Sequence, residues 1–147
     1  EMNEILERTT ANTNPTAKTT IESSFLSAAQ KVLQQVVIAP HIQDFVTRLI
    51  LATHPLSEFA PDWIKKDISV GASPRGAQAV IRGAKVAAVI DGRFAVSFRD
   101  IKAVAVPALQ HRIVRTFEAE TAGRHAIDMI EELLSEVQML DQEVLHG

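Results

Sequence analysis

The sequence predicts an all-α fold, with one short β-hairpin at most. Apolar residues recur at spacings of three and four along most of the chain, which is typical of amphipathic helices. Serine, proline and glycine stand where such helices would begin and end. With 147 residues, 46% of them hydrophobic but only 5% aromatic, the chain is long enough for one domain with an aliphatic core. We therefore expect a single helical domain over residues 1–147.

The N-terminal segment is predicted to be a short helix followed by a loop. Residues 1–8 resemble the end of a helix, with Ile5 and Leu6 as its apolar part. Residues 9–20 are rich in threonine and asparagine and contain Pro15. Such side chains compete for backbone hydrogen bonds, so we expect a flexible loop there.

Two amphipathic helices are expected next. The first runs from Ser24 to about Gln35, and the second covers residues 40–53, with Pro40 in its first turn. Each has apolar residues on one face, which we expect to be buried. The apolar positions are Phe25, Leu26, Ala29, Val32, Leu33 and Val36 in the first helix, and Ile42, Phe45, Val46, Leu49 and Ile50 in the second.

The segment from Pro55 to Val70 has no regular pattern. It contains a second proline, Pro61, and the only tryptophan of the chain, Trp63. We expect a surface loop that Trp63 holds against the domain.

The clearest helix is predicted from Pro74 to about Ile90. Ser73 is a suitable N-cap, and proline is favoured at the first helical position. Gly92 is placed for a left-handed C-cap. Gly83 lies inside this helix, where glycine costs roughly 1 kcal/mol relative to alanine, so we expect another part of the chain to approach closely there.

A short strand and a capped helix are expected after this. Residues 94–96 could form the strand. Ser97 and Asp100 resemble a capping box with aspartate in place of the usual glutamate. The helix would cover residues 98–105 and would be broken at Pro107.

The chain is predicted to end with a helical turn and a long helix. The turn runs from Leu109 to Arg112, and His111 and Arg112 are favourably placed near its C-terminal end. The last helix covers residues 126–145. It could be a coiled-coil arm, but Asp141 interrupts the apolar seam, so packing on the domain core is the favoured interpretation.

Composition and motifs exclude several kinds of site. A net charge of −3 argues against a nucleic-acid binder, and the chain has no cysteine for disulfides or thiolate metal sites. There is no phosphate-binding P-loop, and the five histidines show no metal-ligand spacing. We expect no metal site, and cytoplasmic residence fits the composition. A chain that starts with glutamate rather than methionine also fits a fragment or a processed product.

One segment, residues 70–76, is not fully explained by helix formation. Gly71 suits a turn, Ser73 a cap and Pro74 a first helical position, but Arg75 places a cation where the helix dipole disfavours it by roughly 0.3–1 kcal/mol. An anion at the helix end would reverse this effect, because backbone N–H groups and the guanidinium would converge on it. A phosphate is the obvious anion. The alternative is that Arg75 simply pairs with a nearby carboxylate.

Several motifs in order resemble a known family, the C-terminal lid of MoxR-type AAA+ ATPases. The resemblance is strongest from Ile68 to Thr116 and weaker upstream. It departs from the family at His54-Pro55, where the family usually has a Thr-Arg-like pair, so the helix ending there could end differently. The motifs are Gly71-Ala72-Ser73-Pro74-Arg75-Gly76-Ala77, Gly92-Arg93, Val96-Ser97, Asp100-Ile101, Pro107-Ala108-Leu109 and His111-Arg112.

The resemblance implies a helical-bundle AAA+ lid whose Arg75 is the sensor-2 residue, reading the terminal phosphates of ATP. Ser73 and Pro74 would lie beside the nucleotide with it. The family implies ATP and Mg²⁺ in the full-length parent, an ATPase core upstream of residue 1, and a ring of subunits, expected to be a hexamer. It also implies a chaperone-like role, either remodelling a partner protein or helping to load a metal cofactor. The chain alone would not hydrolyse ATP.

Two other classes of function remain open at this point. The chain could be a free-standing helical interaction module, in which case Arg75 should lie in a salt bridge. It could also be a helix-turn-helix DNA binder, which the acidic net charge disfavours.

Overall fold

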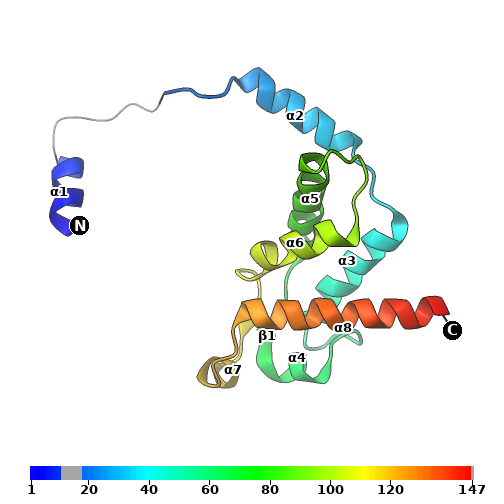
Figure 1. Cartoon of the computed structure of the whole chain (residues 1–147). Helices are drawn as coiled ribbons and strands as arrows, with labels where there is room; N and C mark the ends of the chain where they lie inside the picture. The colour runs from blue at the N-terminus through cyan, green and yellow to red at the C-terminus, as the bar shows by residue number, and fades with distance from the viewer. Residues whose placement is uncertain (11–17, 147) are drawn as a thin grey trace. The chain divides into compact units, whose positions relative to one another are not determined.

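The computed structural model describes residues 1–10 and 18–146, with side chains described as far as residue 137 (Figure 1). The chain divides into two units, Glu1–Lys31 and Val32–Gly147. The predicted fold class is confirmed, since the described residues are mostly helical and contain a single two-stranded sheet.

The first unit contains α1, Met2–Thr10, and the start of α2, Ser23–Gln35. The predicted loop is wrong at Thr9 and Thr10, which extend α1: their hydroxyls donate to the carbonyls of Ile5 (2.7 Å) and Leu6 (2.6 Å) respectively. Residues 18–20 are non-helical as predicted, and residues 11–17 of that loop lie outside the described residues. The helix predicted from Ser24 is confirmed, but most of its apolar face is not buried: Phe25 and Leu26 are exposed, whereas Val36, just after the helix, is buried.

The second unit holds the remaining elements. Their order confirms the helices predicted from Pro40, from Pro74, from residue 98 and from Ala126. The elements are α3 (Pro40–Ala52), α4 (Asp62–Asp67), β1 (Ile68–Val70), α5 (Pro74–Ile90), α6 (Phe98–Leu109), β2 (Val114–Arg115), α7 (Phe117–Thr121) and α8 (Ala126–His146).

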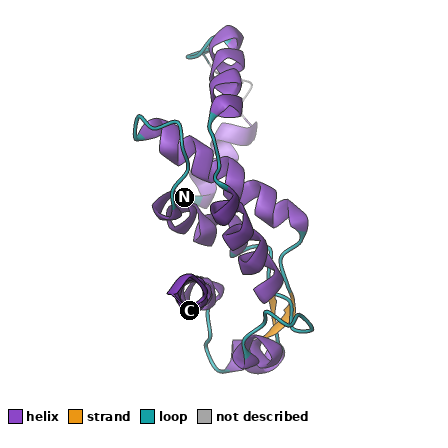
Figure 2. Ribbon diagram, turned by 90° about the vertical axis from the view of Figure 1, so that its right-hand side faces the viewer, coloured by secondary structure: helices purple, strands orange, loops and turns teal. Residues whose placement is uncertain are grey.

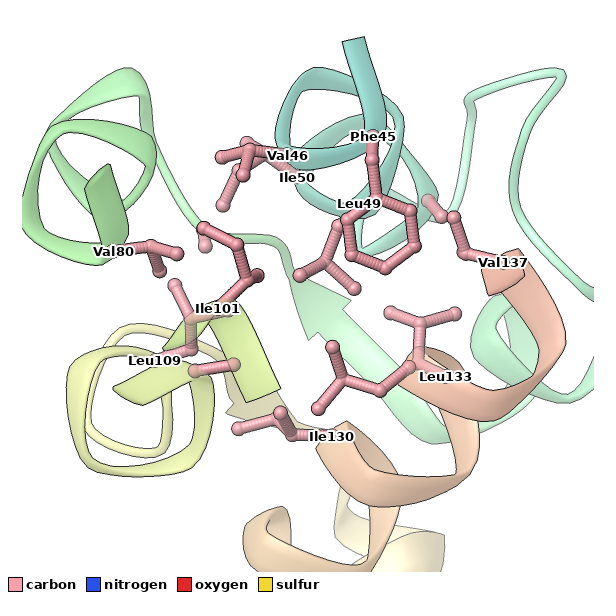
Figure 3. Close-up of a cluster of buried hydrophobic side chains, with 14 of the residues drawn as sticks. Phe45, Val46, Leu49, Ile50, Val80, Ile101, Leu109, Ile130, Leu133 and Val137 are labelled. Atoms are coloured by element: carbon pink, nitrogen blue, oxygen red, sulfur yellow. The ribbon is translucent and has the colours of Figure 1, made fainter. Parts of the chain in front are cut away.

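The core of this unit is aliphatic and is built by α3, α5, α6 and α8 (Figure 3). The apolar face predicted for residues 40–53 is buried in it, and the part of α8 whose side chains are described, as far as Val137, packs against α3 and α6. Ile127, near the start of α8, is an exception, because its side chain is 44% exposed. Side chains at the centre are Phe45, Val46, Leu49, Ile50, Val80, Ile101, Leu109, Ile130, Leu133 and Val137.

The most extensive contact between two helices is that of α5 with α6, and a glycine allows the two helices to lie close together. A Cβ atom at Gly83 would lie 3.3 Å from Cβ of Val104 on α6, so the predicted close approach is confirmed. Gly92 ends α5 with a φ of +72°, the left-handed conformation that its position predicted.

The region predicted as an irregular loop from Pro55 to Val70 is partly regular, because it contains α4 and β1. The sequence did not predict β1 because this strand forms only by pairing with β2, which lies much further along the chain. Figure 2 shows the two strands in orange. The sheet is antiparallel and pairs Ile68 with Arg115. Trp63 does hold the segment in place, but it does so from α4, with its Nε1 bonded to Glu136 of α8.

The predicted strand at residues 94–96 is also wrong. Ala95 forms only an isolated parallel bridge with Val37. The Val37 N–H donates to the Phe94 carbonyl (2.9 Å), and the Val96 N–H donates to the Val37 carbonyl (3.0 Å).

Helix α6 does not break at Pro107, contrary to the prediction. Proline removes one backbone hydrogen bond and usually kinks a helix interior. Here it stands in the last turn, and the helix continues to Leu109, which is fully buried with Ala105 in the core. Packing therefore overrides the local preference. The predicted helical turn from Leu109 to Arg112 is the end of α6 followed by a turn.

Candidate functional site

The N-terminus of α5 carries the three residues that the sequence singled out. Ser73 is at the N-cap position with an extended backbone (φ −72°, ψ 169°), Pro74 opens the helix, and Arg75 follows. The Ser73 hydroxyl makes no capping hydrogen bond, so the predicted cap is right in position but not in contact. Instead, the Gly76 N–H donates to the Ser73 carbonyl at 2.7 Å.

Arg75 is exposed in the first turn of α5. No ion pair or side-chain hydrogen bond of Arg75 is found within residues 1–10 and 18–137, so the carboxylate partner that would have explained this cation is not seen there. α5 has no acidic residue in its first turn to offset the charge. An exposed guanidinium beside a helix N-terminus can bind an anion.

The segment that leads into α5 is fixed by the end of α3. The hydroxyl of Thr53 accepts a hydrogen bond from the Ala72 N–H (2.9 Å) and donates to the Ile50 carbonyl (2.6 Å). Nε2 of His54 lies 2.9 Å from the Ala72 carbonyl oxygen. A carbonyl oxygen can only accept, so Nε2 carries the proton and donates. Both backbone polar groups of the buried Ala72 are thus bonded to neighbouring side chains of one segment.

Glycine is required beside this contact for space rather than for a turn. A Cβ atom at Gly71 would lie 2.7 Å from the Thr53 carbonyl oxygen and 2.8 Å from Cγ of His54. The backbone forms no turn at Gly71, contrary to the prediction, and its φ angle is not positive. Thr53 and His54 were missed because they precede Ala72 by nearly twenty residues, and no local pattern links the two segments.

The far end of α5 is fixed by an ion pair between Arg93, whose side chain is 37% exposed, and the buried Asp100. Arg93 donates from its two terminal nitrogens to the two oxygens of Asp100, at 2.9 and 2.6 Å. The Asp100 side chain is 3% exposed and also accepts from the Ser97 N–H at 2.8 Å, which confirms the predicted capping interaction. The hydrogen bonds from Arg93, supported by those from Ser97, lower the pKa of Asp100 to about 2, although burial opposes this. The same pair raises the pKa of Arg93.

The other polar pair of the sequence has a structural role. Nε of Arg112 donates to the Ala108 carbonyl (2.9 Å) at the end of α6, which confirms its favourable placement near a helix C-terminus. His111 is exposed beside it. Within the described residues there is no group of three histidine or acidic side chains that could hold a metal ion. The same residues include no helix with the length and apolar character needed to cross a bilayer.

Comparisons with known proteins agree on one family. Residues 62–133 match the family model of the AAA lid domain. The chain is 29% identical over 107 residues to the chaperone MoxR1 of Mycobacterium tuberculosis, a match that covers 73% of this chain and 28% of that protein. A crystal structure of a candidate ATPase from Cytophaga hutchinsonii superimposes with a TM-score of 0.74 at 28% identity, covering 91% of this chain and 41% of the other.

Both relatives are much longer than this chain, which spans less than half of either one. The matched region includes α4, α5, α6 and the beginning of α8, and so contains Arg75 and the ion pair at the other end of α5. The residues matched by the family model contain all the motifs from Ile68 to Thr116. Residues 62–133 form an AAA lid domain, and the similarity to the two longer relatives identifies it as a lid of the MoxR type.

Proposed function

We propose that Arg75 is the sensor-2 residue of this lid, and that it contacts the terminal phosphates of ATP held by an AAA+ core domain. Ser73 and Pro74 form the helix end beside the phosphates. The core lies upstream of residue 1 in the parent protein, a cytoplasmic ATPase that assembles into a ring, expected to be a hexamer. Movement of the lid couples hydrolysis to remodelling of a partner protein or to loading of its metal cofactor.

One observation carries the proposal: an exposed arginine in the first turn of a long helix, with no ion-pair partner among the described side chains. A cation there is unfavourable in the isolated domain and becomes favourable when a phosphate binds. The rigid fork of guanidinium donors suits the oxygens of a phosphate.

The chain supplies only part of such an ATPase site. It offers one cation and the start of a helix, while no group of metal-binding side chains is found in the described residues. Mg²⁺ would therefore be held by ATP and by the core domain. It would neutralise charge on the phosphates during transfer. The lid would bind and orient the phosphates and would exclude water when it closes.

The proposal is tested by replacing Arg75 with alanine in the full-length ATPase. Loss of one positioned donor to the transferred phosphate should lower kcat by about 10²-fold, because charge stabilisation dominates phosphoryl transfer. Arg75→Lys should recover part of the rate, since it restores the charge but not the fork. Steady-state ATP turnover measures both variants.

A matched control is available on the same helix. Arg82 is also exposed on α5 but lies two turns further from the helix N-terminus, so Arg82→Ala should keep turnover near the unaltered value. Equal rates for Arg75→Ala and the unaltered ATPase would reject the sensor role and would favour a helical interaction module without nucleotide chemistry.

A further inference from the structure

We propose that Thr53 and His54 are positioning residues for Arg75, so that the end of α3 sets the direction in which the arginine leaves α5. This inference rests on the proposed sensor role of Arg75. It adds that the start of α5 is held by two side chains from another helix end rather than by its own N-cap.

Helix α5 lacks an ordinary N-terminal cap. The Ser73 hydroxyl makes no capping hydrogen bond, and Pro74 has no N–H to donate. An N-cap side chain normally fixes the first turn and contributes roughly 1 kcal/mol. Some other contact must therefore fix the backbone that carries Arg75.

Thr53 and His54 supply that contact at Ala72, three residues before Arg75. One side chain bonds the N–H of Ala72 and the other bonds its carbonyl, each at 2.9 Å. Thr53 is 1% exposed and Ala72 is fully buried, so water cannot replace these bonds. Two bonds on one residue restrict both rotation and sliding of the segment.

The chain is also closely packed on either side of Ala72. Gly71 lies against the Thr53 carbonyl and the His54 ring, with no room for a Cβ atom. In the first turn of α5, a Cβ at Gly76 would lie 3.1 Å from Cδ2 of Leu109 on α6. The helix start is thus wedged between the ends of α3 and α6, and Arg75 is exposed on a rigid support. Small errors in the position of a catalytic group are costly to rate, which gives such a support its function.

Matched substitutions separate hydrogen bonding from packing. Thr53→Val keeps the shape of the side chain but leaves the Ala72 N–H without a partner, whereas Thr53→Ser keeps the hydroxyl. The Ile50 carbonyl loses the hydroxyl in Thr53→Val but still accepts from the backbone N–H of residue 53 (3.1 Å) in both variants. His54→Phe keeps a ring but loses the donor, whereas His54→Gln can place an amide N–H near the same point. Thr47→Val is the control, because Thr47 lies on the same helix and bonds only to its own helix, at the Gln43 carbonyl.

The first measurement uses the 147-residue chain. Amide hydrogen exchange at Ala72 should accelerate about tenfold in Thr53→Val and in His54→Phe, and much less in Thr53→Ser, His54→Gln and Thr47→Val. Unchanged exchange in both loss-of-bond variants would overturn the proposed contact. If Thr53→Val fails to fold, the His54 pair still decides the question.

The second measurement uses ATP turnover by the full-length ATPase. His54→Phe should lower kcat with little change in KM for ATP, and His54→Gln should restore it. In an Arg75→Ala background, His54→Phe should cause no further loss, because the two residues act as one unit. Additive losses would show that His54 acts independently of Arg75 and would overturn the inference. If Arg75→Ala alone leaves turnover unchanged, the sensor role itself has failed, and that result is distinct from failure of the exchange test.

Discussion

Asp100 shows how one buried carboxylate can organise a connection between two helices. Its carboxylate accepts hydrogen bonds from both terminal nitrogens of Arg93 and from the Ser97 N–H, so each carboxylate oxygen has a donor. Arg93 also donates to the Ala95 carbonyl and to Asp91, which ties the whole turn between α5 and α6 to one guanidinium. A buried charge that loses such partners is destabilising, because its desolvation is then uncompensated.

The stability of the chain should therefore depend on Asp100 in acid. Its folded pKa is about 2, below the unfolded value of 3.8, so the unfolded chain takes up the proton first. The stabilisation is present above pH 3.8 and is lost as the pH falls towards 2, which amounts to about 2 kcal/mol for this group. Denaturant unfolding between pH 6 and pH 2 should show the stability advantage over Asp100→Asn shrinking across that interval. Asp44→Asn, at an exposed position of α3, controls for removal of one negative charge. A constant difference between the unaltered chain and Asp100→Asn at all pH values would contradict this account.

The sequence identified single residues well where the cause is local. Ser97 with Asp100, Gly92 and the unusual position of Arg75 could all be predicted, because each depends on a few neighbouring residues. The contacts of Thr53 and His54 could not, since a hydroxyl and an imidazole at a helix end have many local alternatives. Only the folded arrangement of α3 and α5 brings them to Ala72.

At the scale of elements, α4 is joined to α8 by a polar cluster around Arg124. The Arg124 guanidinium lies 5.1 Å from the ring centre of Trp63 and pairs with Asp67 (3.1 Å) and Glu132 (3.0 Å). Trp63 in turn donates from Nε1 to Glu136 at 3.0 Å. Burial by itself lowers the pKa of Arg124, but the hydrogen bonds and charges of Glu132 and Asp67 outweigh it, and the pKa is raised.

We expect Arg124→Ala to destabilise the chain by about 1–3 kcal/mol, because it leaves the partly buried Asp67 without its cation and removes the stacking on Trp63. Trp63→Phe should cost less, since it keeps a ring beneath the guanidinium and loses only one donor. Arg99→Ala is the matched control: this arginine is 85% exposed and lies 4.0 Å from its nearest carboxylate, so its removal should have little effect. Denaturant midpoints for the three variants check this order. Equal effects of Arg124→Ala and Arg99→Ala would show that the cluster adds no stability.

The elements that the sequence missed share a physical cause. The strands β1 and β2 each have too few residues for an alternating pattern, and each exists because the other is present. The short α7 begins at Phe117 after the N-cap Thr116, whose hydroxyl accepts from the Ala119 N–H, and so few residues give no recognisable helical pattern. At Pro107, by contrast, the local sequence predicted a break in the helix, but the burial of Leu109 keeps the chain helical. Long helices with a continuous apolar face, such as α3 and α5, were predicted to within a residue or two.

At the scale of the whole molecule, the two units differ in how much apolar surface they bury. The described side chains of residues 1–31 include none in the core, and Phe25 is 63% exposed. The core begins at Val36 and extends along the second unit as far as Val137. The free energy of folding should therefore come almost entirely from residues 32–147.

Two truncations of opposite effect test this division. A chain that begins at residue 32 should keep its thermal midpoint within about 3 °C, because little buried apolar area is removed. A chain that ends before α8 loses Met129, Ile130, Leu133, Leu134 and Val137 from the core. Each such side chain contributes about 1.5–3 kcal/mol, so their combined loss reaches the total stability of a typical domain, about 5–15 kcal/mol. That chain should not fold. Circular dichroism melting measures both, and a large drop in the midpoint on removal of residues 1–31 would show that the exposed apolar face of α2 has a stabilising role within the chain.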